Sequence, residues 1–155
     1  MAHIEEAETQ SRVALLKRFR QLLVMQRERF RTYLETLDLQ KNLIENGTVE
    51  ELSNYVELEE KIAGDIFSLQ KVIEPLQGMY RFAWNGLEPP EIPEIQTVVE
   101  NLKNEAKNRL ERNKTLLQDR MALIRNEIKE LRASPYRRRR SAYTAAAPSL
   151  IDVQG

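Results

Sequence analysis

Apolar residues recur at helical spacing in the first half of the chain, in two series separated by a short polar break. The break is Asn46-Gly47-Thr48, which is typical of one helix ending and another beginning. The pattern predicts two long helices, about 8–45 and 49–84, joined by a sharp turn. The first series is Leu16, Leu23, Phe30, Leu37 and Ile44; the second is Leu52, Tyr55, Ile62, Ile66, Leu69, Ile73, Leu76, Tyr80 and Ala83.

The turn carries the most specific local signal in the chain. We expect Gly47 to adopt the left-handed conformation that helix C-termini favour. Thr48 has the residue type of an N-cap, and Glu51 stands three positions later, which completes the pattern of a capping box. The two helices should therefore be antiparallel neighbours, and matching steps of three and four residues let them pack along their length.

Proline divides the rest of the chain. Pro75 lies inside the second helix, where it removes a backbone donor, so we expect a kink or break within 71–74. Three prolines within 89–93 disfavour a continuous helix and predict a linker over 85–93.

A third amphipathic helix is predicted over 94–132. Its apolar stripe has one polar interruption, Asn113, which either fixes the register of a packed core or contacts a partner chain. The stripe itself either packs against the first two helices or is offered to a foreign helix. Its residues are Ile95, Val99, Leu102, Ala106, Leu110, Asn113, Leu117, Met121, Ile124, Ile128 and Leu131.

These patterns predict an all-α protein of three long helices: an antiparallel helical hairpin plus a third amphipathic helix, in one domain over 1–133. A flexible basic tail is expected over 134–155. The segment 135–155 holds four Arg and one Asp, while the whole chain has 24 basic and 24 acidic residues. The run Arg137–Arg140 is interpreted as a solvated tail, with binding to an acidic protein surface, to nucleic acid or to a membrane as alternatives. The remainder is slightly acidic, which disfavours nucleic-acid binding as the main task.

The residue types needed for catalysis or metal binding are scarce. The chain has no Cys, and His3 is its single histidine. No glycine-rich phosphate loop or nucleophile elbow occurs. We therefore predict no catalytic residues, no metal and no cofactor. Since neither a signal peptide nor an apolar run of about 20 residues is found, we expect a cytoplasmic protein without membrane insertion.

Three stretches resemble the FlgN-like flagellar export chaperones. The first is the Leu-rich segment 15–47 with its closing turn, and the second is the charged segment 49–62. The third is Asn113-Lys114-Thr115-Leu116-Leu117 with the apolar positions after it, followed by a breaker, Tyr143 and a terminal Gly. The resemblance spans most of the chain.

The resemblance implies a cytoplasmic chaperone that holds flagellar hook-associated junction proteins before type III export. It implies that the third helix and the tail bind the C-terminal helices of these proteins and that Tyr143 helps present them to the export gate. A structural coiled-coil scaffold or adaptor is the alternative, and whether the hairpin forms within one chain or across a homodimer stays open. The partner-binding residues expected are Leu110, Asn113, Leu117, Met121, Ile124, Ile128, Leu131 and Tyr143.

Overall fold

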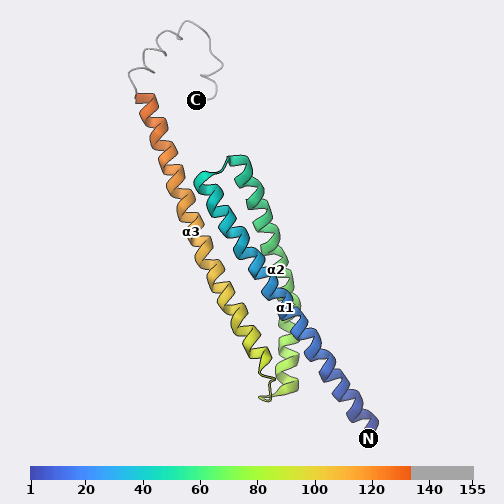
Figure 1. Ribbon diagram of the computed structural model, residues 1–155. Helices are drawn as coiled ribbons and strands as arrows, with labels where there is room; N and C mark the ends of the chain where they lie inside the picture. Colours follow the sequence, from blue (N-terminus) through green and yellow to red (C-terminus); the bar gives the residue numbers. More distant parts are fainter. Residues whose placement is uncertain (134–155) are drawn as a thin grey trace. The chain divides into compact units, whose positions relative to one another are not determined.

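The computed structural model describes residues 1–133 and contains three helices there, with no strand in that range (Figure 1). They are α1 (Ala2–Asn46), α2 (Val49–Trp84) and α3 (Glu91–Ala133). The all-α class and the three long helices are confirmed. The Arg137–Arg140 run, Tyr143 and the rest of the predicted tail lie outside the described residues. The chain divides into two compact units, Met1–Lys114 and Thr115–Gly155, and each is considered by itself.

The hairpin turn forms where the sequence predicts it. The Thr48 hydroxyl accepts a hydrogen bond from the Glu51 backbone N–H at 3.2 Å, and the Glu51 carboxylate accepts one from the Thr48 N–H at 3.1 Å. This reciprocal pair is the predicted capping box, and it satisfies two donors that would otherwise lack a partner at the start of α2. α1 and α2 lie side by side as an antiparallel pair (Figure 1).

Removing this cap should weaken the hairpin measurably. Thr48→Ala is expected to lower the free energy of unfolding by about 1 kcal/mol, because the N–H of Glu51 loses its acceptor. Urea denaturation followed by circular dichroism measures the change. Thr32→Ala is the control: its exposed hydroxyl bonds the Glu28 carbonyl within α1, and Ala is a better helix former, so stability should not fall. Equal losses in both variants would contradict the role of the cap.

The predicted conformation of Gly47 is wrong. Its backbone is extended, with φ −92° and ψ 177°, and is not left-handed. Glycine is still required there for a different reason. A Cβ at this position would lie 2.8 Å from the carbonyl oxygen of Leu43 and 2.9 Å from its Cα, which is closer than side chains tolerate. The chain therefore leaves α1 by passing close to its own last turn.

Two predicted interruptions also differ from the structure. Of the kink or break expected before Pro75, the break does not occur: α2 runs through Pro75, because the loss of one backbone hydrogen bond is outweighed by buried neighbours such as Ile73 and Tyr80. α3 begins at Glu91, earlier than predicted, with Pro93 in its first turn, where a helix needs no N–H donor. α1 also begins earlier, at Ala2, although residues 1–14 are all exposed.

The core of the unit Met1–Lys114 has two apolar clusters, and each draws on all three helices. Residues 92–106 of α3 thus pack against the hairpin and complete its core. The first cluster contains Phe30, Tyr33, Leu34, Leu37, Ile62, Val99 and Ala106. The second contains Phe19, Leu22, Leu23, Ile73, Tyr80 and Ile92.

Polar residues interrupt this core at two positions along α1. Gln26 is 4% exposed and donates a hydrogen bond from Nε2 to Oε1 of Gln70, at 2.7 Å. Gln40 is 7% exposed and accepts one from Asn113, at 3.0 Å. Buried amides that must find one another fix the axial register of packed helices, because a shift would leave them unpaired.

Candidate helix-binding site

The described part of the unit Thr115–Gly155 is the last section of α3, and it exposes a row of apolar side chains. The row advances in steps of four and three residues, so its members share one face of the helix. We call this row the stripe. Its members and exposed fractions are Leu117 (36%), Met121 (45%), Ile124 (45%), Ile128 (41%) and Leu131 (59%).

Exposed apolar side chains occur singly on most protein surfaces, but a regular row of five indicates a binding face. Helix-in-groove recognition uses anchors at this spacing. Arg125, Glu127 and Arg132 are also exposed and lie beside the stripe. The arrangement is an apolar seam with charged margins, which suits contact with another amphipathic helix.

Two of the predicted partner-binding residues belong to the other unit, Met1–Lys114. Leu110 is 37% exposed and precedes the stripe along α3. Asn113 is only 3% exposed, and its Nδ2 donates hydrogen bonds to the Leu37 carbonyl at 2.8 Å and to Gln40 Oε1 at 3.0 Å. Its Oδ1 accepts from the Arg112 guanidinium. Asn113 therefore has the geometry of a core residue that fixes register, and a partner would have to break these bonds to reach it.

An ion-pair network surrounds Asn113 at the margin of the core. Asp38 accepts hydrogen bonds from Arg109 and Arg112, both at 3.0 Å, and Arg109 also pairs with Glu105 at 2.9 Å. Arg109 further donates to the Leu34 carbonyl at 3.3 Å. Each arginine thus joins α3 to α1 by a charged contact, which adds specificity to the apolar packing.

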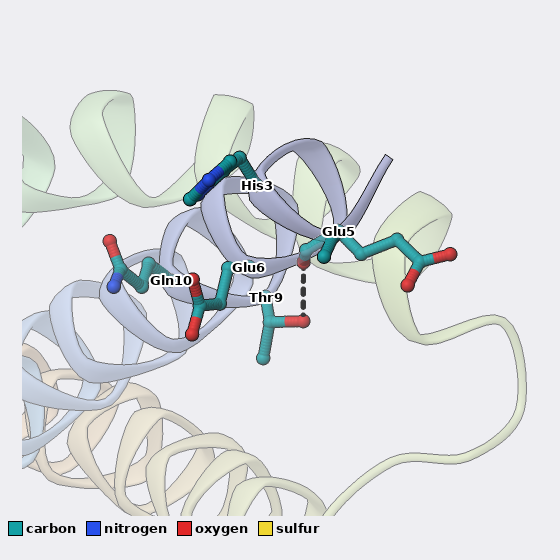
Figure 2. Close-up of a pocket in the computed structure, with 6 residues that line it drawn as sticks. His3, Glu5, Glu6, Thr9 and Gln10 are labelled. Carbon is teal, nitrogen blue, oxygen red and sulfur yellow. Dashed lines mark hydrogen bonds between the residues drawn. The ribbon is translucent and has the colours of Figure 1, made fainter.

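The described residues form several open surface depressions. One of about 440 Å³ lies at the start of α1 and is lined by Ala2, His3, Glu5, Glu6, Thr9 and Gln10, all exposed (Figure 2). His3 and Glu5 point in different directions there, and the hydrogen bond drawn joins the Thr9 hydroxyl to the Glu5 carbonyl at 2.8 Å. Within 1–133, acidic and histidine side chains form no group able to hold a metal ion.

The hydroxyl of Tyr33 lies between α1 and α2 and has a raised pKa. Burial, the hydrogen bond to Glu59 at 2.6 Å and the charge of that carboxylate all raise the pKa of Tyr33. A raised pKa in the folded state means that the unfolded chain loses this proton first as pH rises. The Tyr33 hydroxyl therefore contributes fully to the free energy of unfolding below the pKa of tyrosine in the unfolded chain, about 10. This contribution is lost as the pH rises above that value.

Tyr33→Phe is accordingly expected to reduce the loss of stability between neutral pH and about pH 11. Thermal unfolding at a series of pH values measures this slope. Glu59→Gln should also reduce the loss, because the charge that helps to raise the pKa of Tyr33 is removed. An unchanged slope in Tyr33→Phe would show that Tyr33 is not the group responsible.

Sequence reasoning did not identify a second exposed apolar group, which lies on α2. Its members are at least 48% exposed, and their spacing of seven and three residues was a signal that could have revealed them. The ladder chosen for α2 took the buried face and left this one out. The residues are Val72, Met79 and Phe82.

The fold is that of an all-α protein, and the end of α3 exposes a row of apolar side chains. The chain is similar to an uncharacterized protein of Treponema pallidum (strain Nichols), with 31% identity over 133 residues. The match covers 86% of this chain and 85% of that protein, and the chain belongs to the same family. No family model and no solved structure matches. Within residues 1–133, none of the helices has the length and apolarity needed to cross a membrane.

Proposed function

We propose that this protein is an export chaperone that binds amphipathic helices of a client protein through the stripe on α3. The observation that carries the proposal is the row of five exposed apolar side chains from Leu117 to Leu131. A helix that exposes such a row is stabilised when another helix covers it, because both apolar surfaces leave water.

The client is proposed from the resemblance described above. FlgN-like chaperones hold the C-terminal helices of flagellar hook-associated junction proteins in the cytoplasm and deliver them to the type III export gate. Such helices aggregate when unassembled, and a chaperone in excess keeps them covered by mass action until release. This role needs binding and no catalysis, so we propose that the protein is not an enzyme and that it acts in the cytoplasm.

Exposure and hydrogen bonding of the described side chains support a role for each residue. We propose the stripe as the apolar grip, with Leu110 as a peripheral contact. Asn113 is assigned to the register of the core, since its hydrogen bonds lie within its own unit. Tyr143, outside the described residues, is proposed as the contact to the export gate on the strength of the resemblance alone.

The test is direct binding of the full chain to synthetic peptides of the C-terminal helices of junction proteins from the same host. Isothermal titration calorimetry should show binding with a negative heat-capacity change, the mark of buried apolar surface. A peptide of the same composition in scrambled order should not bind. If no junction helix binds, the chaperone proposal fails, and a scaffold or adaptor role becomes the better hypothesis.

Ile124→Ser should weaken that binding by about tenfold or more, because it removes one buried aliphatic side chain from the centre of the grip. Leu123→Ser is the matched control. Leu123 is 62% exposed, but it lies about 100° around the helix from Ile124 and so falls outside the stripe. Circular dichroism checks that both variants stay helical. Equal weakening by both substitutions would show that the stripe is not the binding face.

A further inference from the structure

Positive charge is concentrated on α1, in residues 12–31. This section, which we call the basic section, holds seven basic residues and one acidic residue, Glu28, so it carries an excess of six positive charges. The whole chain, by contrast, has equal numbers of basic and acidic residues. All seven are exposed except Arg27, which is half-buried. They are Arg12, Lys17, Arg18, Arg20, Arg27, Arg29 and Arg31.

Ion pairs within the described chain neutralise only part of this charge. Glu28 is shared by Arg27 at 3.2 Å and Arg31 at 2.9 Å, and Arg20 pairs with Glu91 of α3 at 3.3 Å. Like charges three or four residues apart repel one another along a helix, so the arrangement disfavours α1 unless a partner neutralises it. Four cations form no ion pair within residues 1–133: Arg12, Lys17, Arg18 and Arg29.

An open depression of about 530 Å³ lies within the basic section. Three of its lining residues are cations, two are apolar, and no acidic residue of the described chain lines it. Met25 is 44% exposed and Val24 is half-buried, so a small apolar surface adjoins the positive charge. We call this site the basic depression. Its lining residues are Lys17, Arg18, Arg20, Gln21, Val24 and Met25.

This combination fits an acidic protein segment better than nucleic acid or a membrane. Contacts to phosphates dominate nucleic-acid binding, and they would leave Val24 and Met25 without a partner while Glu28 repels the phosphates. A helix that lies in a membrane surface turns its apolar face to the lipid, but Phe19 and Leu23 on the apolar face of α1 are buried in the core. An acidic amphipathic helix offers both carboxylates and apolar side chains on one face.

The chain's own acidic residues are a poorer match for the basic depression. Glu94 and Glu100 of α3 form no ion pair within residues 1–133. A second copy would have to offer the acidic residues of 35–65, and some of these are already engaged. Asp38 bonds two arginines of α3, and Glu51 completes the capping box.

We propose that the basic depression binds an acidic amphipathic helix of a protein partner. Carboxylates of that helix pair with Lys17 and Arg18, which have no carboxylate of their own in the described chain, and an apolar side chain covers Met25. The rest of the basic section attracts the partner over a longer range and speeds its association. The site uses no residue of the stripe on α3, so the inference does not depend on the proposed function.

Fluorescence anisotropy of the full chain with a labelled peptide tests the charged contacts. The probe is an alanine-based helical peptide that carries Glu along one face with a single central Leu, and the same peptide with Gln in place of Glu should not bind. Lys17→Gln with Arg18→Gln should weaken binding of the Glu peptide by about tenfold, because two charge-assisted contacts are lost. Lys103→Gln with Lys107→Gln removes the same charge from exposed positions of α3 and should change the affinity by less than about twofold.

The apolar part of the site has its own test in the same assay. Met25→Gln should weaken binding of the Glu peptide by roughly threefold, because an apolar contact is replaced by a polar side chain of similar length. Met79→Gln makes the same change on α2, where Met79 is 55% exposed, and is the matched control. Circular dichroism checks that every variant stays helical. Equal affinities of Met25→Gln and Met79→Gln would contradict the apolar contact.

The remaining outcomes decide between occupants. No binding of the Glu peptide, equal binding of the Gln peptide, or equal weakening by the two double variants would overturn the proposal. Duplex DNA, and vesicles of phosphatidylcholine and phosphatidylserine in equal amounts, are the rival probes. Tighter binding of either one, lost in Lys17→Gln with Arg18→Gln, would overturn the proposal in favour of that partner. A dimer in sedimentation equilibrium that the same double variant dissociates would overturn it in favour of a second copy.

Discussion

Phe19→Ala is expected to lower the free energy of unfolding by about 3–5 kcal/mol, the largest single effect predicted for this protein. Phe19 is fully buried, and its ring stacks on Tyr80 with 4.9 Å between ring centroids. Truncation removes the apolar transfer energy of the ring and leaves a cavity between α1 and α2. It also removes an aromatic pair, which adds to the loss.

Phe82→Ala is the matched control for this prediction. Phe82 is 90% exposed, so its removal should change the free energy of unfolding by less than about 0.5 kcal/mol. Urea denaturation followed by circular dichroism at 222 nm compares the two variants. A similar loss for both would mean that the exposed face of α2 is covered in solution, and a small loss for Phe19→Ala would contradict the packing of the second cluster.

Asn113→Ala is expected to cost about 2–3 kcal/mol, the second-largest effect. The substitution removes the donor that serves both the Leu37 carbonyl and Gln40 Oε1, and both acceptors belong to buried residues of α1. An unsatisfied buried polar group costs about 1–3 kcal/mol, which exceeds the gain in helix propensity from alanine.

The control for Asn113 is Asn126→Ala, on the exposed part of the same helix. There alanine should be neutral or slightly stabilising, since no buried partner is lost. The same denaturation measurement applies to both. If Asn113→Ala proved as harmless as Asn126→Ala, Asn113 would not be a buried register contact, and its predicted role as a partner contact would regain support.

Local signals in the sequence predicted the hairpin well. The capping box at Thr48 and Glu51 involves neighbouring residues and depends little on the rest of the fold, so its residue types sufficed. The helix boundaries were predicted less well, and the second helix is not broken at Pro75. An isolated helix would be interrupted by proline, but the side chains around Pro75 are held in a core whose packing outweighs one missing hydrogen bond.

The candidate site was predicted in part. The sequence indicated the face of α3 that carries Leu117 to Leu131, because apolar spacing alone defines a face. It left open whether Asn113 served the core or a partner, because one polar residue in an apolar stripe fits both roles. It also missed the second exposed group around Val72 and Phe82, because α2 carries apolar residues on more than one face.

The sequence by itself determined the helical class, the turn and the apolar faces, since these depend on residue type and on periodicity along the chain. Only the tertiary structure decided which section of the apolar face of α3 is buried. Ala106 and Ile124 occupy equivalent positions in one periodic pattern, yet Ala106 is 3% exposed and Ile124 is 45% exposed. The physical reason is that periodicity describes one helix, whereas burial depends on which other helices pack against it.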